Sequence, residues 1–232
     1  MNLKIIIIIF IVILMFNKKI IMESFSSNEI IKLYDIDYKT HKLKNEIFPL
    51  KNYQFYDYKI KGPNKINYLK KYYGKNVLTH GKRQYGNNFK EFKITNFEPA
   101  NINKKHIGCN KFTKRCEFWN KENFKIPPCC ARNLNEIFKH IIKVFKKNNI
   151  EYFAYWGTLI GAIRHKGIIP WDTDIDIYIS DNDLIKIKNN KKIIKQLELP
   201  GHQLIFNIDY LFQLNYSKIN KQHVDIFSYK YN

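Results

Sequence analysis

Arginine is scarce in this chain, although its net charge is strongly positive. The 232 residues include 40 Lys and Arg against 20 Asp and Glu, a formal net charge of +20. Arginine occurs only at Arg83, Arg115, Arg132 and Arg164. A nucleic-acid reader usually needs the planar guanidinium for guanines and phosphates, so a nucleic-acid partner is disfavoured. A base composition that favours Lys, Asn and Ile codons explains the lysine excess. A preference for anionic partners, such as nucleotides, phosphorylated glycans or acidic lipids, is the alternative.

Cysteine and internal repetition are also limited. Four cysteines are too few for a fold built on disulfides and the right number for one zinc site. No repeat of fixed period is visible, which argues against a solenoid. In contrast, 45% hydrophobic and 16% aromatic residues are enough for a packed core and exclude wholesale disorder. The length fits one domain, or one domain and a tail.

The N-terminus carries a targeting pattern. Residues 5–16 read IIIIIFIVILMF, with Lys4 before them and Lys18 and Lys19 after them. The run is short for a membrane span, which needs roughly 20 residues, and it has no clear small-x-small cleavage site. We predict that residues 1–22 are an uncleaved signal-anchor or a signal peptide. The body is then expected in the secretory lumen (ER or Golgi), anchored to the membrane, or secreted if cleaved. A buried strand is the alternative, but it leaves the flanking lysines unexplained.

The rest of the chain divides into two regions that differ in composition and in hydrophobic pattern. Residues 23–105 are rich in Lys and Tyr, and we interpret them as an N-terminal cap or stem region. Residues 106–232 predict an α+β catalytic domain with a mixed sheet and flanking helices. Apolar residues at three- and four-residue steps predict a helix through Leu134, Ile137, Phe138, Ile141, Ile142 and Phe145. Further helices are predicted over 159–164 and from 180 to about 199, with a turn at 157–158. Strands are predicted over 151–156, 174–179, 204–208, 210–216 and 224–228.

Acidic residues are concentrated in the segment WDTDIDI, residues 171–177. In a strand, Asp174 and Asp176 project to one face while the isoleucines between them enter the core. Two carboxylates about 7 Å apart repel each other unless a cation lies between them, and hard oxygen ligands suit Mg²⁺ or Mn²⁺. Asp225, in the apolar run HVDIF, is the candidate third acid. Such a set can support phosphoryl transfer. The alternatives are a solvated acidic loop or a calcium loop, which would need irregular backbone and a glycine turn.

Residues upstream of the acids are suited to phosphate. Gly157 and Thr158 follow a predicted strand, where backbone N–H groups and a hydroxyl can approach a phosphate. Arg164 could neutralise a diphosphate or triphosphate. His165 could position the acceptor or contact a phosphate, and structural packing is an equal alternative for it. We therefore name these four as candidate substrate-binding residues.

The segment YWGTLIGAIRHKGIIPWDTDIDI, residues 155–177, resembles the signature of the LicD/fukutin family, which has a nucleotidyltransferase fold. The resemblance covers about residues 127–228. It implies transfer of a polyol-phosphate or choline-phosphate from a CDP-activated donor to a glycan hydroxyl, with release of CMP. It also implies metal binding by Asp174, Asp176 and Asp225. Asp172 matches an outer acid that would hold a second metal or the acceptor hydroxyl, and a capping role on the loop is its alternative.

The cysteines resemble the zinc loop of fukutin-related proteins, one branch of this family. There, a spaced pair and a vicinal pair bind one structural zinc, which implies that role for Cys109, Cys116, Cys129 and Cys130. Two disulfides are the alternative, which a secretory lumen would favour. His106 is a substitute ligand.

Two other functions remain open. A nucleotidyltransferase would add a nucleoside monophosphate to a protein, RNA or small molecule and release pyrophosphate. A catalytically dead scaffold would bind glycans in the lumen without turnover.

Overall fold

The computed structural model describes residues 30–34, 40–85, 88–103, 109–114 and 125–231. The expected signal or anchor segment, residues 1–22, lies outside them. Among the helices of the described ranges, none combines the length and the apolar character that a membrane span needs. The elements are β1 (Ile30–Leu33), β2 (Thr40–Leu43), α2 (Lys44–Ile47), β3 (Lys51–Phe55), β4 (Tyr58–Gly62), α3 (Asn67–Tyr73), β5 (His80–Tyr85), β6 (Asn88–Lys93), α4 (Pro128–Lys147), β7 (Tyr152–Ala154), α5 (Trp156–Arg164), β8 (Ile175–Ser180), α6 (Asp181–Lys188), α7 (Lys191–Glu198), β9 (Gln203–Ile208), β10 (Leu211–Asn215) and β11 (His223–Tyr231).

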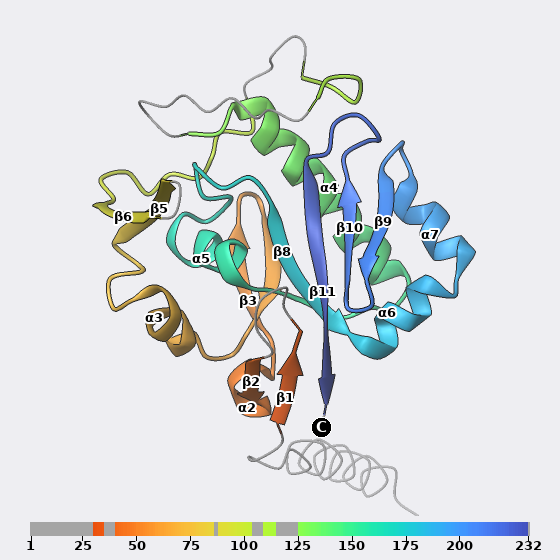
Figure 1. The fold of residues 1–232 in the computed structure, drawn as a ribbon, viewed down its shortest axis with the longest axis horizontal. Coiled ribbons are helices and arrows are strands. Elements are labelled where there is room, and N and C mark those ends of the chain that lie inside the picture. Colours follow the sequence, from red (N-terminus) through yellow and green to blue (C-terminus); the bar gives the residue numbers. More distant parts are fainter. Residues whose placement is uncertain (1–29, 35–39, 86–87, 104–108, 115–124, 232) are drawn as a thin grey trace, which may run out of the picture.

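A seven-stranded mixed sheet forms the centre of the molecule (Figure 1). Its longest strand, β11, runs parallel to β8, and β8 pairs antiparallel with β7. Along its other edge β11 pairs antiparallel with β10 over residues 223–227 and with β1 over residues 229–231. β9 and β2 extend the sheet from β10 and β1. The mixed sheet predicted from the sequence is therefore confirmed.

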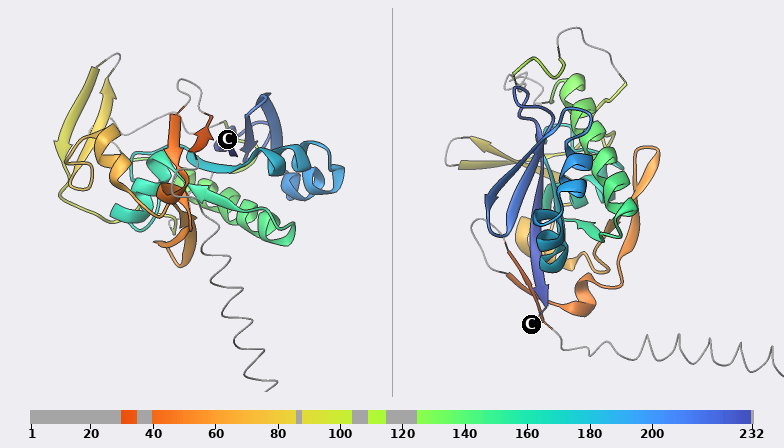
Figure 2. Two further views of the ribbon diagram at one scale, coloured as in Figure 1. Left: turned by 90° about the horizontal axis from the view of Figure 1, so that it is seen from below. Right: turned by 90° about the vertical axis from the view of Figure 1, so that its right-hand side faces the viewer.

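Two hydrophobic cores cover the two faces of this sheet. The alternation along β8 sends Ile175, Ile177 and Ile179 to one face and Tyr178 to the other. Helices α4, α6 and α7 cover the isoleucine face, as Figure 2 shows from two further directions. Helices α5 and α3 cover the tyrosine face. The candidate acids therefore lie on the face that carries α5.

The α4 prediction is confirmed, because the residues at three- and four-residue steps are buried. Five of the six predicted residues are inaccessible to solvent: Leu134, Ile137, Phe138, Ile141 and Phe145. The sixth, Ile142, is partly buried against the same core. An apolar stripe of this kind gives the helix one face to bury against the sheet.

Three local predictions need correction. The single helix expected from 180 to about 199 is two helices, because the side chain of Asn190 accepts hydrogen bonds from the N–H groups of Lys192 and Ile193 and starts α7. The turn expected at 157–158 is the first turn of α5. The strand expected to end at residue 156 ends at Ala154.

Part of the N-terminal region is integrated into the sheet. β1 pairs with the end of β11, and the hairpin β3–β4 packs Phe55 and Ile60 into the core that α4 covers. Local sequence periodicity carries no information about such long-range pairing, so the sequence did not predict it.

Candidate active site at the β8–β11 strand pair

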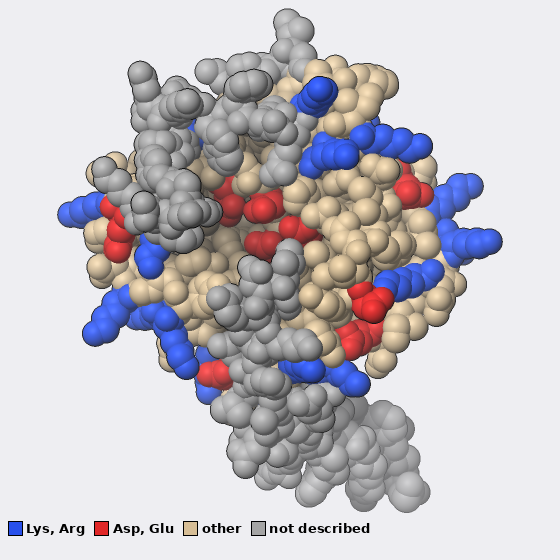
Figure 3. Space-filling model, viewed as in Figure 1, with Lys and Arg blue, Asp and Glu red and all other residues tan. Residues whose placement is uncertain are grey.

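The parallel pairing of β8 and β11 determines where the acids lie. Asp176 is directly opposite Asp225 in the register, and their apolar neighbours, Ile177 and Ile226, are also opposite each other. Because side chains alternate across a strand, the two carboxylates share the face opposite these isoleucines. Figure 3 shows Asp and Glu side chains gathered near the middle of the corresponding surface.

Three potential ligands converge at the start of these strands. One ligand atom from each of Asp174, His223 and Asp225 lies within 4.8 Å of the others. Asp225 is 8% exposed, and its Oδ1 accepts a hydrogen bond from Gln213 Nε2 at 2.7 Å. The structure thus brings Asp174 and Asp225 together, as the sequence predicts.

His223 was missed by the sequence reasoning. Its Nε2 lies 3.4 Å from Asp225 Oδ2, and its Nδ1 lies 3.0 Å from the Lys221 carbonyl oxygen. Burial lowers the pKa of His223, but the hydrogen bond and the charge of Asp225 outweigh it, so the pKa is raised overall. The available signal was its position two residues before Asp225 on one strand, which places both side chains on one face.

Asp176 is not a member of the converging group, although it lies opposite Asp225. Its backbone N–H donates to Thr158 Oγ1 at 2.8 Å, and Thr158 is 5% exposed. The hydroxyl that the sequence assigns to phosphate therefore already joins the first turn of α5 to β8.

Asp172 lies against the start of α5. A Cβ built on Gly157 would lie 2.5 Å from Asp172 Oδ2, so a glycine is needed for this approach. Asp172 Oδ1 accepts the Thr173 N–H at 3.1 Å. Burial and the neighbouring Asp174 carboxylate raise the pKa of Asp172 well above its usual range. Two adjacent carboxylates that resist double ionisation are an arrangement that a cation or a shared proton relieves.

The backbone before Gly157 is strained. Trp156 has a φ of 42°, in the left-handed region that bulky residues rarely adopt. Its ring lies 4.7 Å from that of Tyr72 and 5.0 Å from that of Tyr155, which holds it in place. Strain of this kind persists where the surrounding structure over-determines it, and it is concentrated at functional sites.

Arg164 is engaged with the N-terminal region. Its Nη1 donates to the carbonyl oxygens of Val77 and His80 at 2.7 and 3.0 Å, and its Nε donates to His165 Nε2 at 2.9 Å. Burial lowers its pKa to about 10, against the attraction of Asp172. The contacts of Arg164 thus include a structural tie between α5 and residues 77–80.

His165 is a packed core residue. It is 1% exposed, and its ring lies 5.5 Å from that of Trp171 and 6.1 Å from that of Phe97. Burial, with the Arg164 charge, lowers its pKa to about 4, so it is neutral near pH 7. These contacts favour the packing alternative for His165 over contact with substrate.

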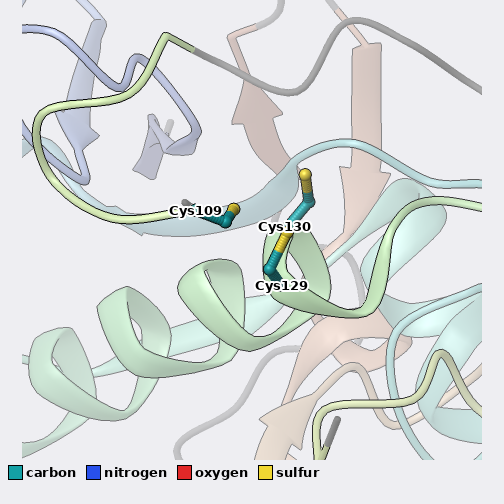
Figure 4. A group of neighbouring side chains, drawn as sticks. All are labelled: Cys109, Cys129 and Cys130. Carbon is teal, nitrogen blue, oxygen red and sulfur yellow. The ribbon is translucent and has the colours of Figure 1, made fainter. Parts of the chain in front are cut away.

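Three of the four cysteines lie together at the start of α4 (Figure 4). One sulfur from each of Cys109, Cys129 and Cys130 lies within 4.8 Å of the others. Cys130 takes part in a disulfide bond, whereas Cys109 and Cys129 do not. Cys116 and His106 lie outside the described residues. The convergence of three cysteine sulfurs is what a zinc site needs, whereas the disulfide bond of Cys130 fits the alternative of two disulfides. Both interpretations of the cysteines therefore stay predictions.

The donor set at the strand pair fits a divalent cation. Carboxylate oxygens are the preferred ligands of Mg²⁺, and one imidazole nitrogen beside them is compatible with Mn²⁺. The buried Asp225 and the adjacent Asp172 and Asp174 carboxylates concentrate negative charge that such an ion offsets.

Comparison with known proteins finds a family model that matches the part of the chain holding this site. Residues 149–232, which include α5, β8 and β11, match the family model described as LicD/FKTN/FKRP, nucleotidyltransferase domain. This part of the chain is a LicD/FKTN/FKRP-type nucleotidyltransferase domain.

Individual relatives agree with this assignment. The chain is 30% identical over 142 residues to ribitol 5-phosphate transferase FKRP of Homo sapiens, covering 53% of this chain and 27% of the relative. It is 51% identical over 47 residues to lipopolysaccharide cholinephosphotransferase LicD of Haemophilus influenzae, covering 20% of this chain and 17% of the relative. The uncharacterized protein RP689 of Rickettsia prowazekii is 36% identical over 106 residues, covering 46% and 36%. The chain thus matches well under half the length of each of these relatives.

Proposed function

We propose that this protein is a metal-dependent phosphotransferase that moves a polyol-phosphate or choline-phosphate from a CDP-activated donor to a glycan hydroxyl and releases CMP. The family assignment supports the reaction class, since two named relatives are a ribitol 5-phosphate transferase and a cholinephosphotransferase. The observation that carries the proposal for this chain is the convergence of Asp174 and Asp225 at the β8–β11 pair, inside the matched domain.

Each acid has a proposed role. Asp174 and Asp225, with Asp176 opposite Asp225, would hold Mg²⁺ or Mn²⁺. A bound ion of this kind neutralises phosphate charge and stabilises the departing phosphate oxygens. Asp172, beside Asp174 and against Gly157, would accept the proton of the attacking glycan hydroxyl. Arg164, the last residue of α5, would add positive charge near the donor phosphates.

The test is a screen for CMP release by the purified full chain. CDP-ribitol, CDP-glycerol and CDP-choline are supplied with Mg²⁺ or Mn²⁺ and a glycan acceptor. We expect CMP release with at least one donor, and we expect Asp174→Asn and Asp225→Asn to reduce it at least 100-fold while the fold is retained. The matched control is Asp209→Asn in the exposed β9–β10 turn, which should behave as the unaltered chain.

Other outcomes identify the rival functions. Release of pyrophosphate from a nucleoside triphosphate would replace the proposal with nucleotidyl transfer, the chemistry for which the domain is described. Metal-dependent binding of a CDP-alcohol without any CMP release would indicate a binding scaffold. Unchanged turnover in Asp174→Asn or Asp225→Asn would refute the assignment of the acids.

We also propose that residues 1–22 target or anchor the protein to the secretory pathway and that the cysteines hold one structural Zn²⁺. Fractionation of cells that express the full chain and a chain lacking residues 1–22 tests the targeting proposal.

Metal analysis with thiol titration tests the zinc proposal: one zinc per chain, lost in Cys129→Ser, supports it. Two disulfides and no zinc would favour the alternative.

A further inference from the structure

The imidazole of His223 is held in one orientation by the backbone just before its strand. Nδ1 lies 3.0 Å from the carbonyl oxygen of Lys221, two residues earlier. Because a carbonyl oxygen only accepts hydrogen bonds, Nδ1 must carry the proton. In the neutral ring, the lone pair is therefore on Nε2. A histidine ligand of a metal commonly donates its other ring N–H to a carbonyl or carboxylate in this way.

That lone pair faces carboxylate oxygens. Nε2 lies 3.4 Å from Asp225 Oδ2, and a carboxylate oxygen of Asp174 lies within 4.8 Å of both groups. The two side chains of His223 and Asp225 are 13% and 11% exposed, so water screens them poorly. Lone pairs that face one another in such a site repel unless a positive charge lies between them, either a proton on Nε2 or a metal ion.

The spacing is that of neighbouring ligands on one ion. Two ligands about 2.2 Å from an ion and at right angles are about 3.1 Å apart, and ligands on opposite sides are about 4.4 Å apart. The 3.4 Å between His223 Nε2 and Asp225 Oδ2 is close to the first value. The Asp174 oxygen lies within 4.8 Å of both groups, so at most a small shift brings it into the same range. Gln213 already binds Asp225 Oδ1, which leaves Oδ2 turned toward His223.

We propose that His223 binds the catalytic divalent ion directly through Nε2, together with Asp174 and Asp225, and that this nitrogen gives the site a preference for Mn²⁺ over Mg²⁺. The inference rests on the proposed metal-dependent function and adds a ligand and a metal preference to it. Imidazole binds transition-metal ions well, whereas Mg²⁺ favours oxygen ligands and retains its water. A site with one nitrogen therefore discriminates in favour of Mn²⁺, and a site of carboxylates alone discriminates less.

The experiment measures the ligands and the affinity of bound Mn²⁺ and does not depend on turnover. Mn²⁺ is bound to the full-length protein, and pulsed electron paramagnetic resonance measures its coupling to nearby nitrogen nuclei, with ¹⁵N-histidine labelling to assign the signal. We expect a directly coordinated imidazole nitrogen in the unaltered chain. His223→Gln should lose it, bind Mn²⁺ roughly 10- to 100-fold more weakly and lower the ratio of Mn²⁺ to Mg²⁺ affinity. His80→Gln, which alters a histidine on β5, should leave signal and affinities unchanged.

The outcomes separate this inference from the proposed function. If Mn²⁺ binds, and Asp174→Asn abolishes the binding, but no nitrogen coupling is seen, the metal site stands and the role of His223 is refuted. His223 is then a protonated partner of Asp225. If the nitrogen signal persists in His223→Gln, the inference is also refuted. If no divalent ion binds the unaltered chain, the proposed metal-dependent function itself fails. Circular dichroism of each variant shows that the fold is retained.

Discussion

The hydroxyl group of Thr158 links α5 to β8 through one hydrogen bond, and its removal tests how much that bond contributes to stability. Thr158 is in the first turn of α5, 5% exposed, and its Oγ1 accepts the backbone N–H of Asp176 at 2.8 Å. Thr158→Val keeps the shape and the methyl group and removes the acceptor. The hydrogen bond from the Asp176 N–H to Thr158 is then lost.

The size of the effect follows from the loss of this one hydrogen bond. A buried donor without a partner costs about 1–3 kcal/mol. In a chain of this size, each kcal/mol corresponds to about 2–4 °C in the melting temperature, so Thr158→Val should melt roughly 2–12 °C lower. Thr158→Ser keeps the acceptor and loses one methyl group, which costs about 1 kcal/mol. Thr158→Ala loses both and should be the least stable.

Chemical unfolding of the three variants and the unaltered chain measures these differences. The expected order of stability is the unaltered chain, then Thr158→Ser, Thr158→Val and Thr158→Ala. Because Asp176 is beside the proposed metal, Thr158→Val should also weaken Mn²⁺ binding, while Thr158→Ser should not. If Thr158→Val is as stable as the unaltered chain, the hydrogen bond is not a significant tie between α5 and β8, and the reasoning is wrong.

Three further predictions concern other contacts. Gly157→Ala places a Cβ 2.5 Å from Asp172 Oδ2, so the carboxylate must move; we expect roughly 10-fold weaker metal binding by calorimetry, and unchanged affinity would show that Asp172 is remote from the ion. His165 has a pKa of about 4 in the fold, below its usual 6.5, so its stabilising contribution is present above pH 6.5 and is lost as the pH falls toward 4. The loss should be on the order of 2 kcal/mol and absent from His165→Asn in urea unfolding at pH 7 and pH 4.5; parallel pH profiles would contradict it. Asn190→Ala removes the cap of α7 and should cost about 1 kcal/mol in the same assay, whereas Asn190→Ser should restore most of it.

The local elements were predictable because each leaves a periodic mark in the sequence. The apolar steps of α4 and the alternation of acid and isoleucine in β8 both survive in the structure, and they place Asp174 and Asp176 at the start of a strand. The break between α6 and α7 had a signal as well, since Asn190 is a good capping residue. The apolar pattern over residues 180–199 is compatible with one long helix, and the prediction therefore did not include the break.

The composition of the site was less predictable, because it depends on register between distant segments. Nothing near His223 marks it as a ligand, and a single histidine on a strand is usually unremarkable. Only the parallel pairing of β8 with β11, and the resulting approach of Asp174, give it chemical meaning. For the same reason the pairing of β1 with β11 is absent from any local pattern.

The first turn of α5 helps to position two of the acids, Asp172 and Asp176. Gly157 lacks the Cβ that would displace Asp172, and Thr158 binds the backbone of Asp176. The two residues expected from the sequence to cradle a phosphate thus also determine where two carboxylates lie. A phosphate at the start of α5 would then meet the helix N-terminus and a metal held by the acids at the same place. Gly157→Ala and Thr158→Val should accordingly change metal affinity and donor affinity together, because one turn of helix positions the ligands of both.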